Sequence, residues 1–100
     1  VELELEDRHM NARGAVMGAV YFTMADFAFA VASNVQSKEA GVVTLDSSIR
    51  FMSSPKGKKL FAEALITKDG RSVCFCTINV TDDTGRRICE VSSTGYKVNP

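Results

Sequence analysis

Residues 11–26 read NARGAVMGAVYFTMAD, a turn-prone segment followed by the start of an apolar helix. Gly18 stands at the small-residue start of the helix, and Asp26 follows about two turns later. Asp26 is the only charged residue between Met17 and Ser33. A lone carboxylate on an apolar helix is costly to bury unless it is paired, hydrogen-bonded or used in a reaction. The segment therefore predicts a functional role for Asp26.

The helix is predicted to span residues 17–34. Alanine is frequent in this range, and Ser33-Asn34 is a suitable end. One stripe at helical spacing is expected to pack on the rest of the protein: Gly18, Phe22, Ala25 and Phe29.

On both sides of this helix the hydrophobic period changes to two, which is typical of strands. Residues 1–6 alternate apolar and acidic side chains and predict a half-exposed strand. After a polar loop at 36–41, four more strands are predicted, at residues 42–52, 58–67, 72–81 and 86–98. In the first of these four, one face is expected to carry Val43, Leu45, Ile49 and Phe51, and the other Thr44, Asp46, Ser48 and Arg50.

Short turns join the last four predicted strands. Residues 53–57 contain Pro55, and both 68–71 and 82–85 carry the Asp and Gly residues of hairpin turns. Hairpins make neighbouring strands antiparallel. One long apolar helix and one antiparallel sheet predict a single α+β domain over residues 1–100, with the sheet wrapped around a central helix.

The overall charge is balanced, with twelve basic and twelve acidic residues. This balance argues against nonspecific binding to nucleic acid or to an anionic membrane. The longest apolar stretch, residues 16–32, is near the lower limit for a membrane span, but Asp26 within it indicates a buried helix. No targeting segment is visible, and a cytoplasmic location is expected. A core this small gains stability from association with another copy.

The three cysteines, Cys74, Cys76 and Cys89, show no spacing typical of a zinc site, and no metal site is predicted. Cys74 and Cys76 share one strand face and are expected to be buried thiols in a reducing compartment. His9 is the only histidine. It lies far from the cysteines in sequence, which argues against a cysteine nucleophile, and it is expected to be a loop or surface residue.

The helix-start segment and the order of elements resemble the hotdog-fold thioesterases, especially the branch of the phenylacetic-acid-pathway and 4-hydroxybenzoyl-CoA thioesterases. The family pattern is approximately N-x-x-G-x-x-H-G-G, then small apolar residues and T-L-A-D. The residues in register with it are Asn11, Gly14, Gly18, Thr23, Ala25 and Asp26. The later run TLDSSIRFMSSP, before a basic turn with glycine, is also similar. Met17 departs from the family histidine and Ala19 from the second glycine.

The resemblance implies a hotdog fold and hydrolysis of an acyl-CoA thioester, with no cofactor beyond the CoA of the substrate. The Gly18 amide, at the positive end of the helix dipole, would face the thioester oxygen. Asp26 would be the general base or the nucleophile. Asn11 would hold the water or the carbonyl region, and the Thr44 hydroxyl would lie near the water. The alternatives are a packing glycine, a hydrogen-bonded aspartate at a dimer contact, a loop asparagine and an ordinary strand threonine.

Gly18 and Asp26 are eight residues apart, which is about 12 Å along a helix. One side chain does not readily close that gap to the same carbonyl group. A site that takes Gly18 from one copy and Asp26 from another resolves the geometry. This predicts a homodimer, and the family resemblance extends it to a dimer of dimers.

Binding of CoA needs cations for its phosphates. The candidates gather at two predicted turns: Lys56, Lys58, Lys59, Lys68 and Arg71. Arg71 follows Gly70 and resembles the basic residue that contacts the nucleotide in some relatives. Lys68, Gly70 and Arg71 are therefore expected to bind CoA. Met17 is expected to make the substrate pocket less polar. The alternative for the basic residues is a solvated rim.

The acyl group is expected to be an aryl or a small to medium acyl chain, by resemblance. The alternative function is an acyl-CoA-binding or regulatory module with weak or no hydrolysis, which Met17 and Ala19 motivate. A hydratase or dehydratase on the same fold would need a site histidine, and Met17 occupies the nearest position.

Overall fold

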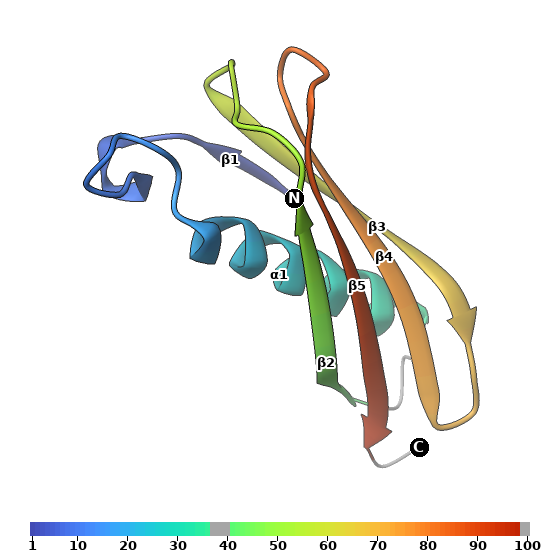
Figure 1. The fold of residues 1–100 in the computed structure, drawn as a ribbon. Helices are drawn as coiled ribbons and strands as arrows, with labels where there is room; N and C mark the ends of the chain where they lie inside the picture. The colour runs from blue at the N-terminus through green and yellow to red at the C-terminus, as the bar shows by residue number, and fades with distance from the viewer. Residues whose placement is uncertain (37–40, 99–100) are drawn as a thin grey trace.

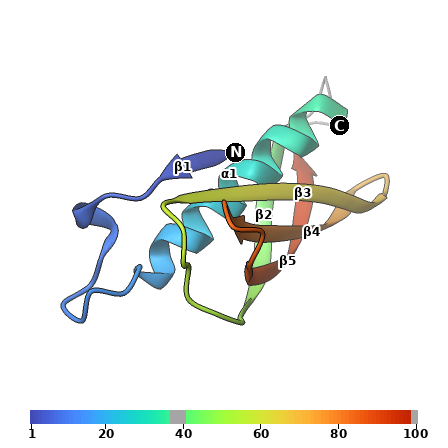
Figure 2. The same cartoon turned by 90° about the horizontal axis from the view of Figure 1, so that it is seen from above.

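The computed structural model describes residues 1–36 and 41–98. Within these residues, one long helix lies across one face of a five-stranded antiparallel sheet that curls around it (Figures 1 and 2). The strand order is β1-β3-β4-β5-β2. The elements are β1 (Glu2–Glu4), a 3-10 helix η1 (Asp7–His9), α1 (Gly18–Gln36), β2 (Gly41–Phe51), β3 (Lys59–Asp69), β4 (Val73–Asp82) and β5 (Arg87–Val98).

The predicted α+β layout and the order of its elements are confirmed, with small differences at their ends. The first strand is shorter than the predicted 1–6, because the chain turns into η1 at Asp7. Strand β3 continues to Asp69 through a bulge between Ile66 and Lys68, so Lys68 and Asp69 belong to the strand instead of opening a turn. The predicted loop at 36–41 falls mostly on residues 37–40, outside the described part of the chain.

The buried stripe of α1 differs from the predicted one. It consists of Tyr21, Met24, Ala25, Ala28 and Phe29. The expected inclusion of Phe22 was wrong, since this side chain is 41% exposed. Phe29 packs so closely on β5 that a Cβ at Gly95 would lie 2.7 Å from its Cζ atom. The glycine in β5 therefore lets the helix approach the sheet.

A bulge in β2 changes which residues face the helix. The register against β5 shifts between Thr44 and Asp46. Before the bulge, Val42 packs against the core and Thr44 bonds to the helix; after it, Ile49 packs against the core. The exposed Val43 and Leu45 lie on the other face, so their predicted position beside Ile49 and Phe51 was wrong. An extra residue reverses the alternation of a strand.

Candidate functional site

The helix start opens into a cavity of about 420 Å³ beside the end of β2. Its lining consists of Ala15, Val16, Gly18, Tyr21, Phe51, Met52, Ser53 and Ser54. Gly18 is the first residue of α1, and its N–H has no hydrogen-bond partner among the described residues. A Cβ at Gly18 would lie 3.2 Å from Cζ of Phe51. The cavity therefore combines an unpaired amide at the positive end of a helix with a mostly apolar wall.

Asn11 shapes the turn that leads into the helix. Its Oδ1 accepts hydrogen bonds from the N–H groups of Arg13 at 2.9 Å and Ala15 at 3.1 Å. The side-chain oxygen is therefore occupied by the backbone, and the side-chain NH₂ group is what remains for another partner. Asn11 does not line the cavity at Gly18. Met17 donates its N–H to the carbonyl of His9 at 2.9 Å, and its side chain is 37% exposed.

Asp26 is exposed on the flank of α1 that faces β2. The Thr44 hydroxyl donates a hydrogen bond to Asp26 Oδ1 at 3.1 Å. None of the ion pairs among the described residues involves Asp26. The bulge in β2 explains this contact, because it places Thr44 on the helix side of the sheet instead of the opposite side. The structure thus brings together two of the four predicted catalytic residues.

Gly18 and Asp26 do not meet within one chain. They lie on one continuous helix, so the spacing of about 12 Å that eight residues give applies here. Asp26 is absent from the lining of the Gly18 cavity. The Gly18 end of α1 lies against Phe51, whereas Asp26 lies against Thr44, so α1 runs antiparallel to β2.

The predicted CoA-binding cations occupy opposite ends of the sheet. Lys56 and Lys58 lie in the β2–β3 connection, at the end where Gly18 lies. Lys68, Gly70 and Arg71 lie at the β3–β4 hairpin, beside the ends of β5 and the start of β2 (Figure 1). The five cations therefore form no single cluster within one chain.

Gly70 has a structural role in this hairpin. Its N–H donates to the carbonyl of Val73 at 2.9 Å. A Cβ at Gly70 would lie 2.5 Å from the same oxygen, so the turn leaves no room for a side chain. Arg71, which follows it, is exposed.

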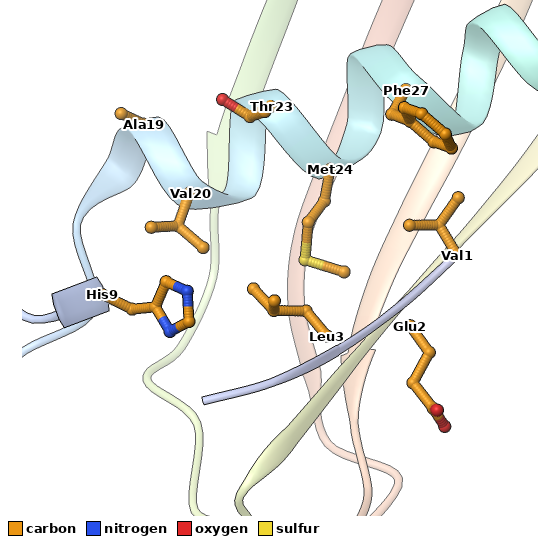
Figure 3. Close-up of a pocket in the computed structure, with 9 residues that line it drawn as sticks. All are labelled: Val1, Glu2, Leu3, His9, Ala19, Val20, Thr23, Met24 and Phe27. Atoms are coloured by element: carbon orange, nitrogen blue, oxygen red, sulfur yellow. The ribbon is translucent and has the colours of Figure 1, made fainter. Parts of the chain in front are cut away.

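A second cavity, of about 490 Å³, lies on the other flank of α1, next to β1 (Figure 3). Its lining consists of Val1, Glu2, Leu3, His9, Ala19, Val20, Thr23, Met24 and Phe27. None of the predicted catalytic residues belongs to this set. His9 ends η1, is half-buried, and its Nδ1 accepts the N–H of Glu6 at 2.8 Å, so it lies in a short 3-10 helix and not in the expected loop.

All three cysteines are buried and free, as predicted. Burial raises the pKa of the Cys76 thiol to about 11 and that of the Cys89 thiol to about 11. Burial is also the main reason that the pKa of Cys74 is raised. Thiols with raised pKa values are poor nucleophiles near neutral pH.

Residues 1–36 and 41–98 contain no group of three or more potential metal-ligating side chains. No helix in the same ranges has the length and apolar character needed to cross a membrane.

Sequence reasoning missed Tyr21 and Phe51 as lining residues of the cavity. Tyr21 lies three residues after Gly18 and hence on the same helix face, so the spacing alone held a signal for it. Phe51 was expected on one strand face with Ile49, but strand alternation does not indicate that it lies against the start of the helix.

The thioesterase superfamily model matches residues 13–89 of the chain. A protein of Archaeoglobus fulgidus named "Putative esterase" is 33% identical over 100 residues, which cover 99% of this chain and 64% of that protein. Acyl-coenzyme A thioesterase 13 of Mus musculus is 28% identical over 100 residues, which cover 98% of this chain and 71% of that protein. The chain thus spans 64% of the length of the first relative.

Solved structures match the fold closely. A Bacillus halodurans protein solved with CoA has a TM-score of 0.92 at 21% identity, over 97% of this chain and 69% of that one. The E. coli PaaI protein has a TM-score of 0.90 at 19% identity, over 98% and 70%. A Streptococcus mutans protein bound to acetyl-CoA has a TM-score of 0.88 at 26% identity, over 97% and 77%. The predicted hotdog fold is confirmed.

Proposed function

Because the chain belongs to the thioesterase superfamily, we propose that it hydrolyses an acyl-CoA thioester to the free acid and CoA. Water adds to the thioester carbonyl, the C–S bond breaks, and the CoA thiol leaves with a proton. The observation that carries this proposal is the exposed Asp26 carboxylate, held by the Thr44 hydroxyl at 3.1 Å on the helix that begins with the unpaired Gly18 amide.

A second copy of the chain completes the site. Strand β2 ends the sheet order, so one of its edges is unpaired among the described residues. Phe22, four residues before Asp26 and on the same flank of α1, is 41% exposed. A long open edge beside an apolar surface favours pairing with another copy.

A two-fold axis between two β2 edges gives the right geometry. It makes the paired strands antiparallel. Because Leu45 is an extra residue in the register, Thr44 and Phe51 each lie three register positions from Ser48. An axis at Ser48 therefore places Thr44 of one copy opposite Phe51 of the other. Asp26 lies beside Thr44, and Gly18 lies beside Phe51. The Asp26 carboxylate of one copy therefore approaches the Gly18 amide of the other.

Each residue has a defined task in this site. The Gly18 N–H donates to the thioester oxygen, where negative charge develops in the transition state. Asp26 activates the water as a general base or attacks the carbonyl carbon itself, and Thr44 orients the carboxylate. The free side-chain NH₂ of Asn11 is available to hold the water.

The same two-fold axis places cations of both copies at the same end of the combined sheet. It places the β3–β4 hairpin of the second copy, with Lys68 and Arg71, at the end of the sheet where Lys56 and Lys58 of the first copy lie. Cations from both copies would thus bind the CoA phosphates. Met17, exposed at the helix start, would contact the acyl or pantetheine part.

The test measures CoA release with a thiol-reactive dye from a panel of aryl- and acyl-CoA esters. The native chain should release CoA from at least one ester, and Asp26→Asn should abolish turnover while circular dichroism and molecular mass in solution stay unchanged. Glu63→Gln, on the exposed outer face of β3, is the matched control and should keep native activity. Native turnover in Asp26→Asn would remove Asp26 as base or nucleophile.

The second candidate function is an acyl-CoA-binding module without hydrolysis. It is favoured by Met17, because this side chain gives the helix entrance no polar group where the family pattern has a histidine. The same assay separates the two functions. Binding of the esters by calorimetry without any release of thiol would establish the binding module.

A further inference from the structure

Tyr21 is a nearly buried side chain whose polar atom has no partner. The residue is 5% exposed, and its ring packs against Phe51 with centroids 6.0 Å apart at 57°. No hydrogen bond to its hydroxyl occurs among the described residues. Buried tyrosines usually satisfy this group. The hydroxyl is also not among the fully enclosed polar atoms without a partner, so its small exposed area reaches open space.

That open space is the cavity at the helix start. Tyr21 and Gly18 both line it, together with Phe51 and the serines that follow β2. Side chains of a helix lean toward its N-terminus, and residues three apart lie on one face. The phenol of Tyr21 therefore extends back toward the first turn, where the Gly18 amide is unpaired.

We infer that Tyr21 is a catalytic residue whose hydroxyl donates a second hydrogen bond to the thioester oxygen beside the Gly18 N–H. This inference rests on the proposed thioesterase function and adds a donor to the same site. Acyl-transfer sites commonly hold the developing oxyanion with two or more donors. The ring of Phe51 forms an apolar wall beside both donors, and hydrogen bonds are stronger in apolar surroundings.

The ionisation of Tyr21 agrees with this role. Burial, and secondarily the neighbouring Cys89 thiol, raises the pKa of the Tyr21 phenol above its usual value. The phenol therefore stays protonated at neutral pH and keeps a proton to donate. The phenol forms no covalent bond with the substrate and transfers no proton in the reaction. The leaving thiol takes its proton from the attacking water.

Tyr21→Phe tests the inference, because it keeps the ring on Phe51 and removes only an oxygen that has no partner in the folded chain. The expected result is a fall in kcat of about 100-fold, the usual loss for one oxyanion donor. The KM for the ester and the affinity for CoA by calorimetry should stay within about twofold. The melting temperature should stay equal or rise, since no hydrogen bond of the fold is lost.

Tyr96→Phe is the matched control. Tyr96 is the second of two tyrosines, is 43% exposed, and lies on the outer face of β5. This variant should keep native kcat and KM. If native protein turns over and Tyr21→Phe has the same kcat, the role of Tyr21 is overturned while the thioesterase function stands. If native protein releases no CoA from any ester, both the thioesterase function and the catalytic role of Tyr21 are overturned.

A second measurement covers the case in which Tyr21→Phe fails to fold. In the Tyr96→Phe protein, Tyr21 is the sole tyrosine, so difluorotyrosine can be placed at this position alone. Fluorination lowers the pKa of the phenol while keeping its shape. The alkaline loss of kcat should then begin at a lower pH than in unfluorinated Tyr96→Phe. An unchanged pH profile would overturn the inference.

Discussion

At the scale of single residues, the most specific contact is the hydrogen bond from Thr44 to Asp26. Thr44→Val keeps the shape of the side chain and removes the donor. A hydrogen bond to a charged group contributes about 1.5–3 kcal/mol, so we expect kcat to fall about 10- to 100-fold. Thr44→Ser keeps the hydroxyl and should retain most of the activity. The steady-state kinetics of the two variants check this, and equal kcat values would show that the hydroxyl has no role.

The residues near the helix start show which parts of the site could be predicted from the sequence. Asp26 and Gly18 were identifiable because an isolated charge and a small residue at a helix start are visible in the sequence itself. The contact of Asp26 with Thr44 was not predictable from strand alternation, which places Thr44 on the opposite face. Tyr21 was missed because the predicted helix stripe was rotated to include Phe22 in its place.

At the scale of elements, strands and hairpins were predictable because their signals are local. Alternation and Asp-Gly turns depend on a few neighbouring residues. The bulges at Leu45 and Thr67 were not predictable, because a bulge is defined by the register of two paired strands. These pairs are β2 with β5 and β3 with β4. Because one extra residue reverses the face on which side chains lie, alternation alone predicted the wrong sheet face for Val43.

Asp82 ties together the two connections at the Gly18 end of the sheet. The side chain is buried. Its Oδ2 accepts the N–H groups of Lys56 at 2.8 Å and Gly57 at 3.1 Å. Its Oδ1 accepts the Thr84 hydroxyl at 2.6 Å and the Arg86 N–H at 3.0 Å. The loop that carries the cavity-lining serines is thereby fixed to the β4–β5 hairpin.

Asp82→Asn should destabilise the protein at neutral pH, because the new NH₂ group would face backbone N–H donors. The Thr84 hydroxyl first, with the backbone N–H groups of Lys56, Gly57 and Arg86, holds the pKa of Asp82 well below its usual range. As the pH falls, the Asp82 carboxylate of the unfolded chain is therefore protonated before that of the folded chain. The stabilisation is complete above the unfolded pKa and is lost as the pH decreases below about 4.

Urea unfolding from pH 7 to pH 3 measures this difference. The gap in unfolding free energy between native protein and Asp82→Asn should be constant at neutral pH and should narrow in acid. A gap that widens in acid would contradict the hydrogen-bonding account of Asp82.

At the scale of the whole molecule, the groups of the proposed site lie at separate places in one chain. The Gly18 cavity and the Asp26 carboxylate lie at different points along one helix, and the cations lie at opposite ends of the sheet. The open β2 edge and the exposed Phe22, at 41%, mark the surface that a second copy would cover. The spacing of Gly18 and Asp26 in the sequence predicted that a second copy is needed, because the rise per residue of a helix is independent of tertiary structure.

A mixing experiment tests whether two copies share each site. Gly18→Pro removes the Gly18 N–H at the first helical position, where proline is well tolerated. Asp26→Asn removes the carboxylate. Each variant alone should be inactive, because every site in its homodimer lacks one of the two groups.

Unfolding and refolding the two variants together should restore activity. In a heterodimer one site receives both defects and the other receives both native residues. Random two-fold assembly at equal concentrations makes half of the dimers heterodimers, so about a quarter of the native kcat should return. If both groups served the same chain's site, no mixture would recover, because every chain would still carry one defect. Recovery with the concentration dependence of a dimer would place the amide and the carboxylate of each site on different copies.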